Sequence, residues 1–474
     1  MNRNTFRTFA TLAILALGLF VSTASPARAQ IRIIDPTLPT IFLPGPNYLS
    51  EITAGAFHTC VRKYNGTVLC WGLNGWYTGT GGQVGVTSTN SCADKEIQNP
   101  NQISVPPVTY RPCVPTPQVV PQTLSPVSQV VAGWYHTCAL SGGTASCWGS
   151  NASGALGDGG LTDRTNPQAV AWPQGAGAAV QFTSLSAGDS ATCGLSAGGV
   201  FCWGSSFYDP NAASYSAKPK LLNAFNGFRG FTVGSRFGCG VYIVGGWGEN
   251  DCQGLDNKGQ LGLDGSASWV PKYLTYDRNG NVSSSTPYTP FFVMSATGFG
   301  SDGAPHVARS AAGAAFMCAE VMDGTVQCVG SNDSGQLGTQ NNQFDHASGA
   351  AVTNTGGTAL QLHGVTTGDN HACALDPSGY AYCWGSGQYG ELGHNATGYG
   401  LKSYGAVPVA GGVTFRALAA GHRHTCGIGT DNYVYCWGDN EYGQLGVGLN
   451  TIGTSPGGFT PATYTGYLRR LGPL

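Results

Sequence analysis

Charged residues are scarce in this sequence. Asp, Glu, Lys and Arg make up 10% of the 474 residues, against about 25% in an ordinary soluble protein. The formal net charge is −2, so the electrostatic attraction that nucleic acids and anionic membranes require is missing. We therefore expect neither nucleic acid nor a membrane surface as the partner.

Long apolar runs are absent after the N-terminal segment, so no membrane insertion is expected. In that segment Arg3 and Arg7 precede an apolar run from Ala10 to Ser22, and Ala27-Arg28-Ala29 offers a small-x-small cleavage site. We predict that residues 1–29 are a signal peptide cleaved after Ala29 and that the mature chain is periplasmic or secreted. An uncleaved anchor is the alternative, which the shortness of the apolar run disfavours.

Cysteine spacing of the kind that binds zinc is also absent. No two of the 16 cysteines stand in a C-x2-4-C arrangement, so we predict no metal site. Calcium is disfavoured because no D-x-D-x-D-G loop occurs. No set of acid, base and nucleophile is identifiable, so we predict no catalytic residues, no cofactor and no enzymatic activity.

One unit of about 50 residues recurs seven times, which is the mark of a solenoid, propeller or array. Its clearest copy runs from Ala420 to Gly446 and reads A-G-H-R-H-T-C-G-I-G-T-D-N-Y-V-Y-C-W-G-D-N-E-Y-G-Q-L-G. The first cysteines of the copies are Cys60, Cys138, Cys193, Cys239, Cys318, Cys373 and Cys426.

A second cysteine follows each first one across a turn. In the second copy Gly142-Gly143 lies at the midpoint, so a two-residue turn places the cysteines opposite one another on a β-hairpin. Where the two cysteines of a copy are ten residues apart, a three-residue loop is required. Its third residue has to adopt a left-handed backbone conformation, and this residue is Gly66, Gly324, Gly379 or Asn432. In an oxidising compartment the cysteines are predicted to form eight disulfides: Cys60–Cys70, Cys92–Cys113, Cys138–Cys147, Cys193–Cys202, Cys239–Cys252, Cys318–Cys328, Cys373–Cys383 and Cys426–Cys436.

Each unit supplies about four short strands, too few to bury its own apolar face. Four-stranded units repeated radially make a β-propeller, so we predict an all-β fold with seven four-stranded blades and one hairpin disulfide per blade. Residues 30–474 form this single domain. The apolar segments 31–46 and 459–464 both resemble a late strand, and one is expected to complete a blade begun by the other end of the chain.

The motifs A-G-x-x-H-T-C, G-x-V-Y-C-W-G-x-N-x-x-G-Q-L-G and a late Pro-x-x-Val resemble the repeat of the regulator-of-chromosome-condensation propellers, over roughly Ile52 to Tyr467. The resemblance implies a secreted, bacterial-type member of that family. Some relatives exchange guanine nucleotides on a small GTPase, and at least one secreted relative inhibits β-lactamases, so the fold does not decide the function.

Two repeated side chains are interpreted as structural. Four histidines lie two residues before a first cysteine, and equivalent positions on separate blades point around a ring rather than at one another. The tryptophans after the second cysteines are expected to pack between blades. These residues are His58, His136, His371 and His424, and Trp71, Trp148, Trp203, Trp384 and Trp437.

Two insertions, at about 86–115 and 277–306, interrupt the repeats. The second follows a predicted late strand, Val270–Leu274, and its Asn279-Gly280 predicts a hairpin turn. Long loops on a rigid scaffold often carry binding residues, although a tolerated insertion without a partner is equally open.

We predict a monomeric, secreted, non-enzymatic module that binds an extracellular or periplasmic protein, or a surface polymer. The insertions and four exposed aromatics are the candidate binding surface: Trp76, Tyr77, Phe207 and Tyr208. Inhibition of an extracellular hydrolase such as a β-lactamase is the alternative, and exchange on a small GTPase is a weaker one because it conflicts with export.

Overall fold

The computed structural model describes residues 45, 47–75, 81–94, 109–121, 126–171, 180–205, 215–222, 228–244, 247–254, 258, 260, 272–276, 282–287, 307–340, 346–449, 464–472 and 474. All of its strands lie in one compact unit, residues 46–474. Within the described residues no helix has the length and apolar character needed to cross a membrane. The predicted signal peptide lies outside the described residues, so it stays a prediction.

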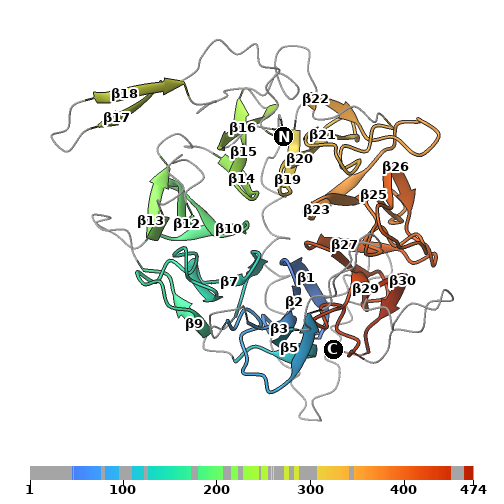
Figure 1. Ribbon diagram of the computed structural model, residues 1–474, viewed down its shortest axis with the longest axis horizontal. Helices are drawn as coiled ribbons and strands as arrows, with labels where there is room; N and C mark the ends of the chain where they lie inside the picture. The colour runs from blue at the N-terminus through green and yellow to red at the C-terminus, as the bar shows by residue number, and fades with distance from the viewer. Residues whose placement is uncertain are drawn as a thin grey trace, which may run out of the picture. The chain divides into compact units, whose positions relative to one another are not determined.

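Antiparallel sheets stand around a common centre in chain order (Figure 1). The first three consist of β1 (Leu49–Ala54), β2 (His58–Lys63), β3 (Val68–Leu73), β5 (Thr109–Val119) and β4 (Ser91–Asp94); β6 (Gln129–Ala132), β7 (His136–Ser141), β8 (Thr144–Gly149) and β9 (Arg164–Ala169); and β10 (Phe182–Ala187), β11 (Ala191–Ser196), β12 (Gly199–Ser205) and β13 (Tyr215–Leu222).

The fourth repeat forms β14 (Phe228–Val233), β15 (Phe237–Val244) and β16 (Trp247–Gly254). The last three sheets consist of β19 (Val307–Ala312), β20 (Phe316–Val321), β21 (Val326–Gly330) and β22 (His346–Ala351); β23 (His363–Thr367), β24 (His371–Leu375), β25 (Ala381–Ser386) and β26 (Lys402–Pro408); and β27 (Phe415–Ala420), β28 (His424–Gly429), β29 (Val434–Asp439) and β30 (Tyr464–Arg470).

The prediction of seven four-stranded blades is wrong in its count. Six sheets are complete blades with four or five strands, and the described part of the fourth repeat gives a sheet of three. The strand expected to complete that repeat, β17 (Lys272–Tyr276), instead pairs with β18 (Val282–Pro287) as a separate two-stranded sheet. The predicted hairpin of the second insertion is therefore present, while its turn residues lie outside the described part of the chain.

The end of the chain also differs from expectation. The last blade is completed by β30, which pairs with β29 of the same repeat, so all four of its strands come from the C-terminal end. The ring closes instead by packing between blades, because side chains of the first repeat share one apolar cluster with side chains of the last. Its members include Leu49, Val61, Trp71, Ala419, Ile428, Leu445 and Leu471.

The hairpin register is as predicted. Each pair of repeat cysteines lies directly opposite across two neighbouring strands, and the Cα atoms are 4.0–4.1 Å apart. With Cys92–Cys113 in the first insertion, all eight predicted disulfides are confirmed. The turn residues have the expected left-handed φ, from 53° at Gly142 to 86° at Gly324, with Asn432 at 67°.

Seven glycines, one from each repeat, form the inner ring. A Cβ atom on any of them would lie only 2.2–2.7 Å from the carbonyl oxygen of the equivalent glycine in the next repeat, and the last of these contacts runs from Gly421 back to Gly55. Only a residue without a side chain allows the inner strands to approach this closely. The members are Gly55, Gly133, Gly188, Gly234, Gly313, Gly368 and Gly421.

At four junctions between repeats, a histidine, a threonine and a tryptophan join one blade to its neighbour. The Nε2 atom of His58 lies 2.8 Å from Thr137 Oγ1, and this hydroxyl donates to the carbonyl oxygen of Gln83 at 2.7 Å. The indole of Trp148 donates to the same carbonyl at 3.0 Å. His136, His371 and His424 make the same contact with Thr192, Thr425 and Thr59. The structural interpretation of the histidines and tryptophans is therefore confirmed.

Candidate binding face at the mouth of the central channel

A hollow of about 70 Å³ lies at the ring centre, where the turns between the first and second strands of all seven repeats meet. Each repeat contributes three consecutive residues, from Ala54-Gly55-Ala56 in the first repeat to Ala420-Gly421-His422 in the last. The first two residues are small in nearly every copy, so the third decides the chemistry. Around the ring this third residue is Ala56, Trp134, Asp189, Ser235, Ala314, Asp369 and His422.

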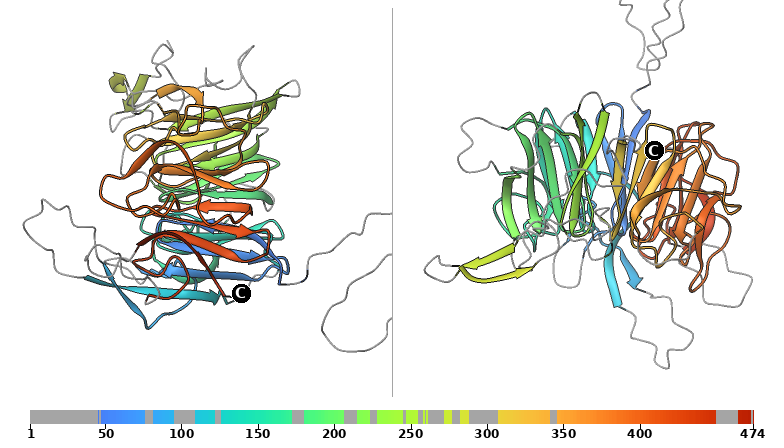
Figure 2. Two further views of the ribbon diagram at one scale, coloured as in Figure 1. Left: turned by 90° about the vertical axis from the view of Figure 1, so that its right-hand side faces the viewer. Right: turned by 90° about the horizontal axis from the view of Figure 1, so that it is seen from above.

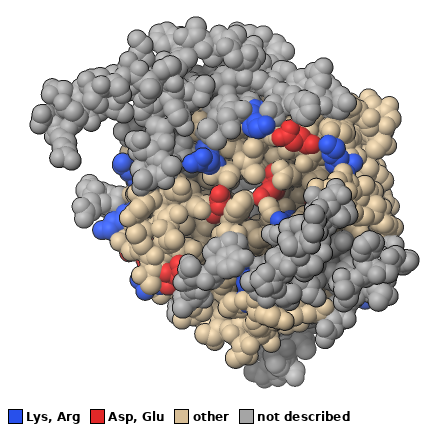
Figure 3. Space-filling view, viewed as in Figure 1, with Lys and Arg blue, Asp and Glu red and all other residues tan. Residues whose placement is uncertain are grey.

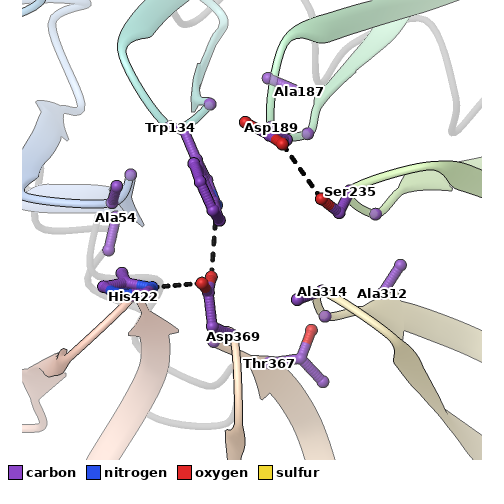
Figure 4. Close-up of a pocket in the computed structure, with 18 of the residues that line it drawn as sticks. Ala54, Trp134, Ala187, Asp189, Ser235, Ala312, Ala314, Thr367, Asp369 and His422 are labelled. Carbon is purple, nitrogen blue, oxygen red and sulfur yellow. Dashed lines mark hydrogen bonds and ion pairs between the residues drawn. The ribbon is translucent and has the colours of Figure 1, made fainter. Parts of the chain in front are cut away.

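Asp369 holds two of these side chains together (Figure 4). Its Oδ1 accepts a hydrogen bond from Trp134 Nε1 at 3.2 Å, and its Oδ2 is paired with His422 Nδ1. The imidazole of His422 also meets the Trp134 ring edge-on, with 5.6 Å between the ring centres. Repeats that are distant in sequence thus build one hydrogen-bonded cluster on the ring axis.

Asp189 stands apart from that cluster. Its Oδ2 accepts from the Ser235 hydroxyl at 3.0 Å and its Oδ1 from the Ser190 hydroxyl at 3.2 Å. Burial and, to a smaller extent, repulsion from Asp369 raise the pKa of Asp189. The hollow therefore holds two carboxylates, and the charge of Asp369 disfavours that of Asp189.

Aromatic rings and an arginine border the hollow. Phe57 packs edge-on against His422 and Tyr442, at 5.2 Å between ring centres in both cases. The guanidinium of Arg423 lies 4.3 Å from the ring centre of Tyr389 and 5.8 Å from the ring centre of Phe57. Acidic and basic side chains are both seen around the centre in the view along the ring axis (Figure 3).

The first insertion is attached to this same region. Its strands β4 and β5 project beyond the other strands of the ring (Figure 2). Cys92 and Cys113 are buried in one apolar cluster with Phe57, Leu73 and Tyr442, against which Trp134 and Tyr135 also pack. We call this surface the channel face and define it by Phe57, Trp134, Tyr135, Asp189, Asp369, His422, Arg423 and the β4–β5 hairpin.

The four aromatics predicted as a binding surface, Trp76, Tyr77, Phe207 and Tyr208, all lie outside the described residues, so that prediction is not tested. The channel face was missed. Its signal was present in the repeat A-G-x-x-H, because the two x positions change from copy to copy within a constant frame. They are Trp134-Tyr135 in the second copy and His422-Arg423 in the last.

The arrangement favours binding over nucleophilic catalysis. The pair of His422 and Asp369 resembles part of a catalytic triad, but a triad needs a nucleophile within hydrogen-bonding reach of the imidazole. Among the described residues no hydroxyl, thiol or amine is hydrogen-bonded to His422, whose contacts are Asp369 and the aromatic rings. Half-buried Trp, Tyr and Arg side chains are instead the residues that most often dominate protein interfaces.

A closed ring of antiparallel sheets, each built from the same repeated unit and carrying a hairpin disulfide, defines a β-propeller. The comparison with known families gives the type of repeat. The chain carries regulator of chromosome condensation (RCC1) repeats, matched at residues 50–75, 127–155, 363–391 and 415–444, and by a second profile of the same repeat at 378–428.

The similar proteins include the ultraviolet-B receptor UVR8 of Arabidopsis thaliana, with 28% identity over 69% of this chain and 68% of that protein. The regulator of chromosome condensation of Xenopus laevis has 27% identity over 68% of this chain and 73% of that protein. These two relatives are named for a receptor and a regulator rather than for an enzymatic activity.

The structure of Prp20p from Saccharomyces cerevisiae is similar in fold, with a TM-score of 0.59 and 18% identity, over 90% of this chain and 87% of that one. The three similar proteins come from a plant, a frog and a yeast, so they give no support to the expected bacterial type.

Proposed function

We propose that this protein is a non-enzymatic module that binds a partner protein on the channel face. The observation that carries the proposal is the convergence of half-buried Trp134 and Tyr135 with the disulfide-stapled β4–β5 hairpin on one face. Tyr110 of this hairpin is 68% exposed, so a further aromatic side chain is available on the hairpin. Rigid aromatic side chains supply contact area at a low entropic cost, which suits them to protein binding.

Similar proteins support only the general part of this proposal. Prp20p is described by its binding to Gsp1p and to histones, both of which are proteins, and we extend to this chain the binding of a protein and nothing more specific. A surface polymer is the alternative ligand. Capture of a hydrolase that loses activity in the complex would favour the inhibitor function, and accelerated nucleotide release from a captured small GTPase would favour exchange.

The test is a substitution on the channel face. We expect Trp134→Ala to weaken binding of the partner, isolated by crosslinking from fluid around the native host, by about tenfold or more, because truncation of a central Trp typically costs 2 kcal/mol or more. Tyr380→Ala is the control. Tyr380 is exposed at the turn between β24 and β25, at the end of these strands that lies away from the channel face. Equal losses in both variants, or none in Trp134→Ala, would refute a channel-face site.

We also propose that the protein is exported and oxidised. The support is the signal-like segment together with the pairing of all 16 cysteines, since such disulfides form in oxidising compartments. The mass of the native protein should correspond to a chain starting at Gln30, and alkylation without reduction should add nothing. A full-length chain with reactive thiols would contradict export.

A further inference from the structure

Among the described residues that line the hollow at the channel mouth, the charged side chains other than His422 are all carboxylates. Its described lining contains the carboxylates of Asp189 and Asp369, the imidazole of His422 and no Lys or Arg. Most of the remaining lining is glycine and alanine, including Ala312 and Ala314 opposite Trp134 (Figure 4). Small side chains on one side and an indole ring on the other leave a slot with carboxylates beside it.

The nearby basic side chains do not neutralise Asp189. Among the described residues its hydrogen bonds come from the hydroxyls of Ser190 and Ser235. The exposed Arg236 offsets its charge less than these bonds do. Arg423 is directed toward Tyr389 and Phe57. Asp369 is oriented by Trp134 and His422, but His422 provides a positive charge only when it is protonated.

We propose that this hollow receives the positively charged head of an Arg or Lys side chain presented by the partner protein, an inference that rests on the proposed function. The carboxylate of Asp189 would accept charge-assisted hydrogen bonds from the cation, and the face of Trp134 would stack against it. A volume of about 70 Å³ holds several water molecules and is sufficient for a guanidinium group.

Other occupants fit less well. A divalent metal needs several converging ligands, and the described residues contain no group of three His, Cys, Asp or Glu side chains that could hold one. An anion would be repelled by the carboxylates. An apolar side chain would remove water from the carboxylates without replacing their hydrogen bonds, which costs free energy. A cation alone would offset the negative charge of the two carboxylates.

The experiment compares two probes that differ in charge and hardly in shape, capped arginine and capped citrulline. The readout is the indole N–H signal of Trp134 in the NMR spectrum of the whole disulfide-bonded protein, identified by its loss in Trp134→Phe. We expect capped arginine to shift this signal with a dissociation constant on the order of millimolar. Capped citrulline should bind about tenfold more weakly or not at all, because it lacks the charge.

The variant Asp189→Asn should weaken arginine binding by about tenfold, since it removes a charged acceptor and keeps the shape. The matched control is Asp323→Asn, which removes the same charge from an exposed residue in the turn between β20 and β21, and it should bind like the wild type. A third variant, Ala314→Leu, should block the slot and abolish the shift.

The proposal is overturned if capped arginine gives no shift, if citrulline binds equally well, or if Asp189→Asn and Asp323→Asn behave alike. These results would leave the proposed function intact as long as Trp134→Ala still weakens partner capture. A different outcome is that capped arginine binds but Trp134→Ala has no effect on partner capture. This outcome would refute the proposed function, and it would also show that the cation is not supplied by the partner.

Discussion

Replacing Gly421 by alanine is expected to lower the free energy of unfolding by about 3 kcal/mol or more, because it overpacks a rigid contact. The new Cβ would lie 2.4 Å from the carbonyl oxygen of Gly55 and 2.4 Å from Cε1 of His424. Neither neighbour can easily move, since Gly55 belongs to the inner ring and His424 is buried and hydrogen-bonded to Thr59. The clash lies where the last repeat meets the first.

Urea unfolding followed by near-ultraviolet circular dichroism measures this effect, because the tryptophans between the blades report on blade packing. The control is Gly230→Ala in β14, where an added Cβ meets nothing within 4 Å and the φ angle is not in the left-handed region. This control should be nearly neutral. If Gly421→Ala unfolds at the same urea concentration as the control, the inner ring is not held by close glycine contacts.

Local features were predictable from the sequence. The number of residues between Cys138 and Cys147, together with Gly142-Gly143 at the midpoint, determines a hairpin register without any knowledge of the rest of the chain. Such a register depends on turn chemistry and on side-chain alternation, which are short-range properties. For this reason the seven hairpin disulfides and the left-handed residues at the turns are as predicted, whereas Cys92–Cys113 was predicted as the one remaining pair.

The pairing of late strands was harder to predict. Residues 272–276 have the β-forming composition expected of a fourth strand, but composition does not specify the partner. Pairing with β18 closes a shorter loop than pairing with β16, and shorter loops lose less entropy on closure. The last blade is completed by its own repeat for a similar reason, because β30 follows β29 in the chain.

The channel face depends on the closed ring. Trp134 and Asp369 are 235 residues apart, yet their side chains are hydrogen-bonded. The sequence displays the two variable positions in A-G-x-x-H, but only the closed ring shows that these positions point toward one axis. The four predicted aromatics, Trp76, Tyr77, Phe207 and Tyr208, were instead expected to be exposed, and exposure alone does not say which side chains lie together.

Acid is expected to unfold the protein through its buried histidines. Four imidazoles have almost no exposed surface, and burial lowers their pKa from 6.5 to about 3 for His58, His371 and His424 and to about 4 for His136. Each Thr hydroxyl already donates to a carbonyl, so the imidazole donates from Nε2. The Nδ1 atoms of His58, His371 and His424 have no partner, so an added proton would be buried without an acceptor.

The sign of the pH dependence follows from these values. The unfolded chain protonates its histidines near pH 6.5, whereas the folded chain does not until about pH 3–4. Stability is therefore fully present above pH 6.5 and falls as the pH decreases through this window. Each histidine contributes about 1.4 kcal/mol per pH unit. Burial is the main cause that raises the pKa of Asp439 to about 6, so Asp439 takes up a proton in the folded state. This uptake offsets the contribution of about one of the four histidines.

A single substitution isolates one histidine. Phe237 and Phe316 occupy the equivalent position in the fourth and fifth repeats, so the protein itself shows that phenylalanine fits this site. In His371→Phe the slope of unfolding free energy against pH, measured between pH 6 and 4, should decrease by about 1.4 kcal/mol per pH unit. His363→Phe replaces an exposed histidine of β23 and should leave the slope unchanged. If both variants keep the wild-type slope, protonation of the inter-blade histidines is not the cause of acid unfolding.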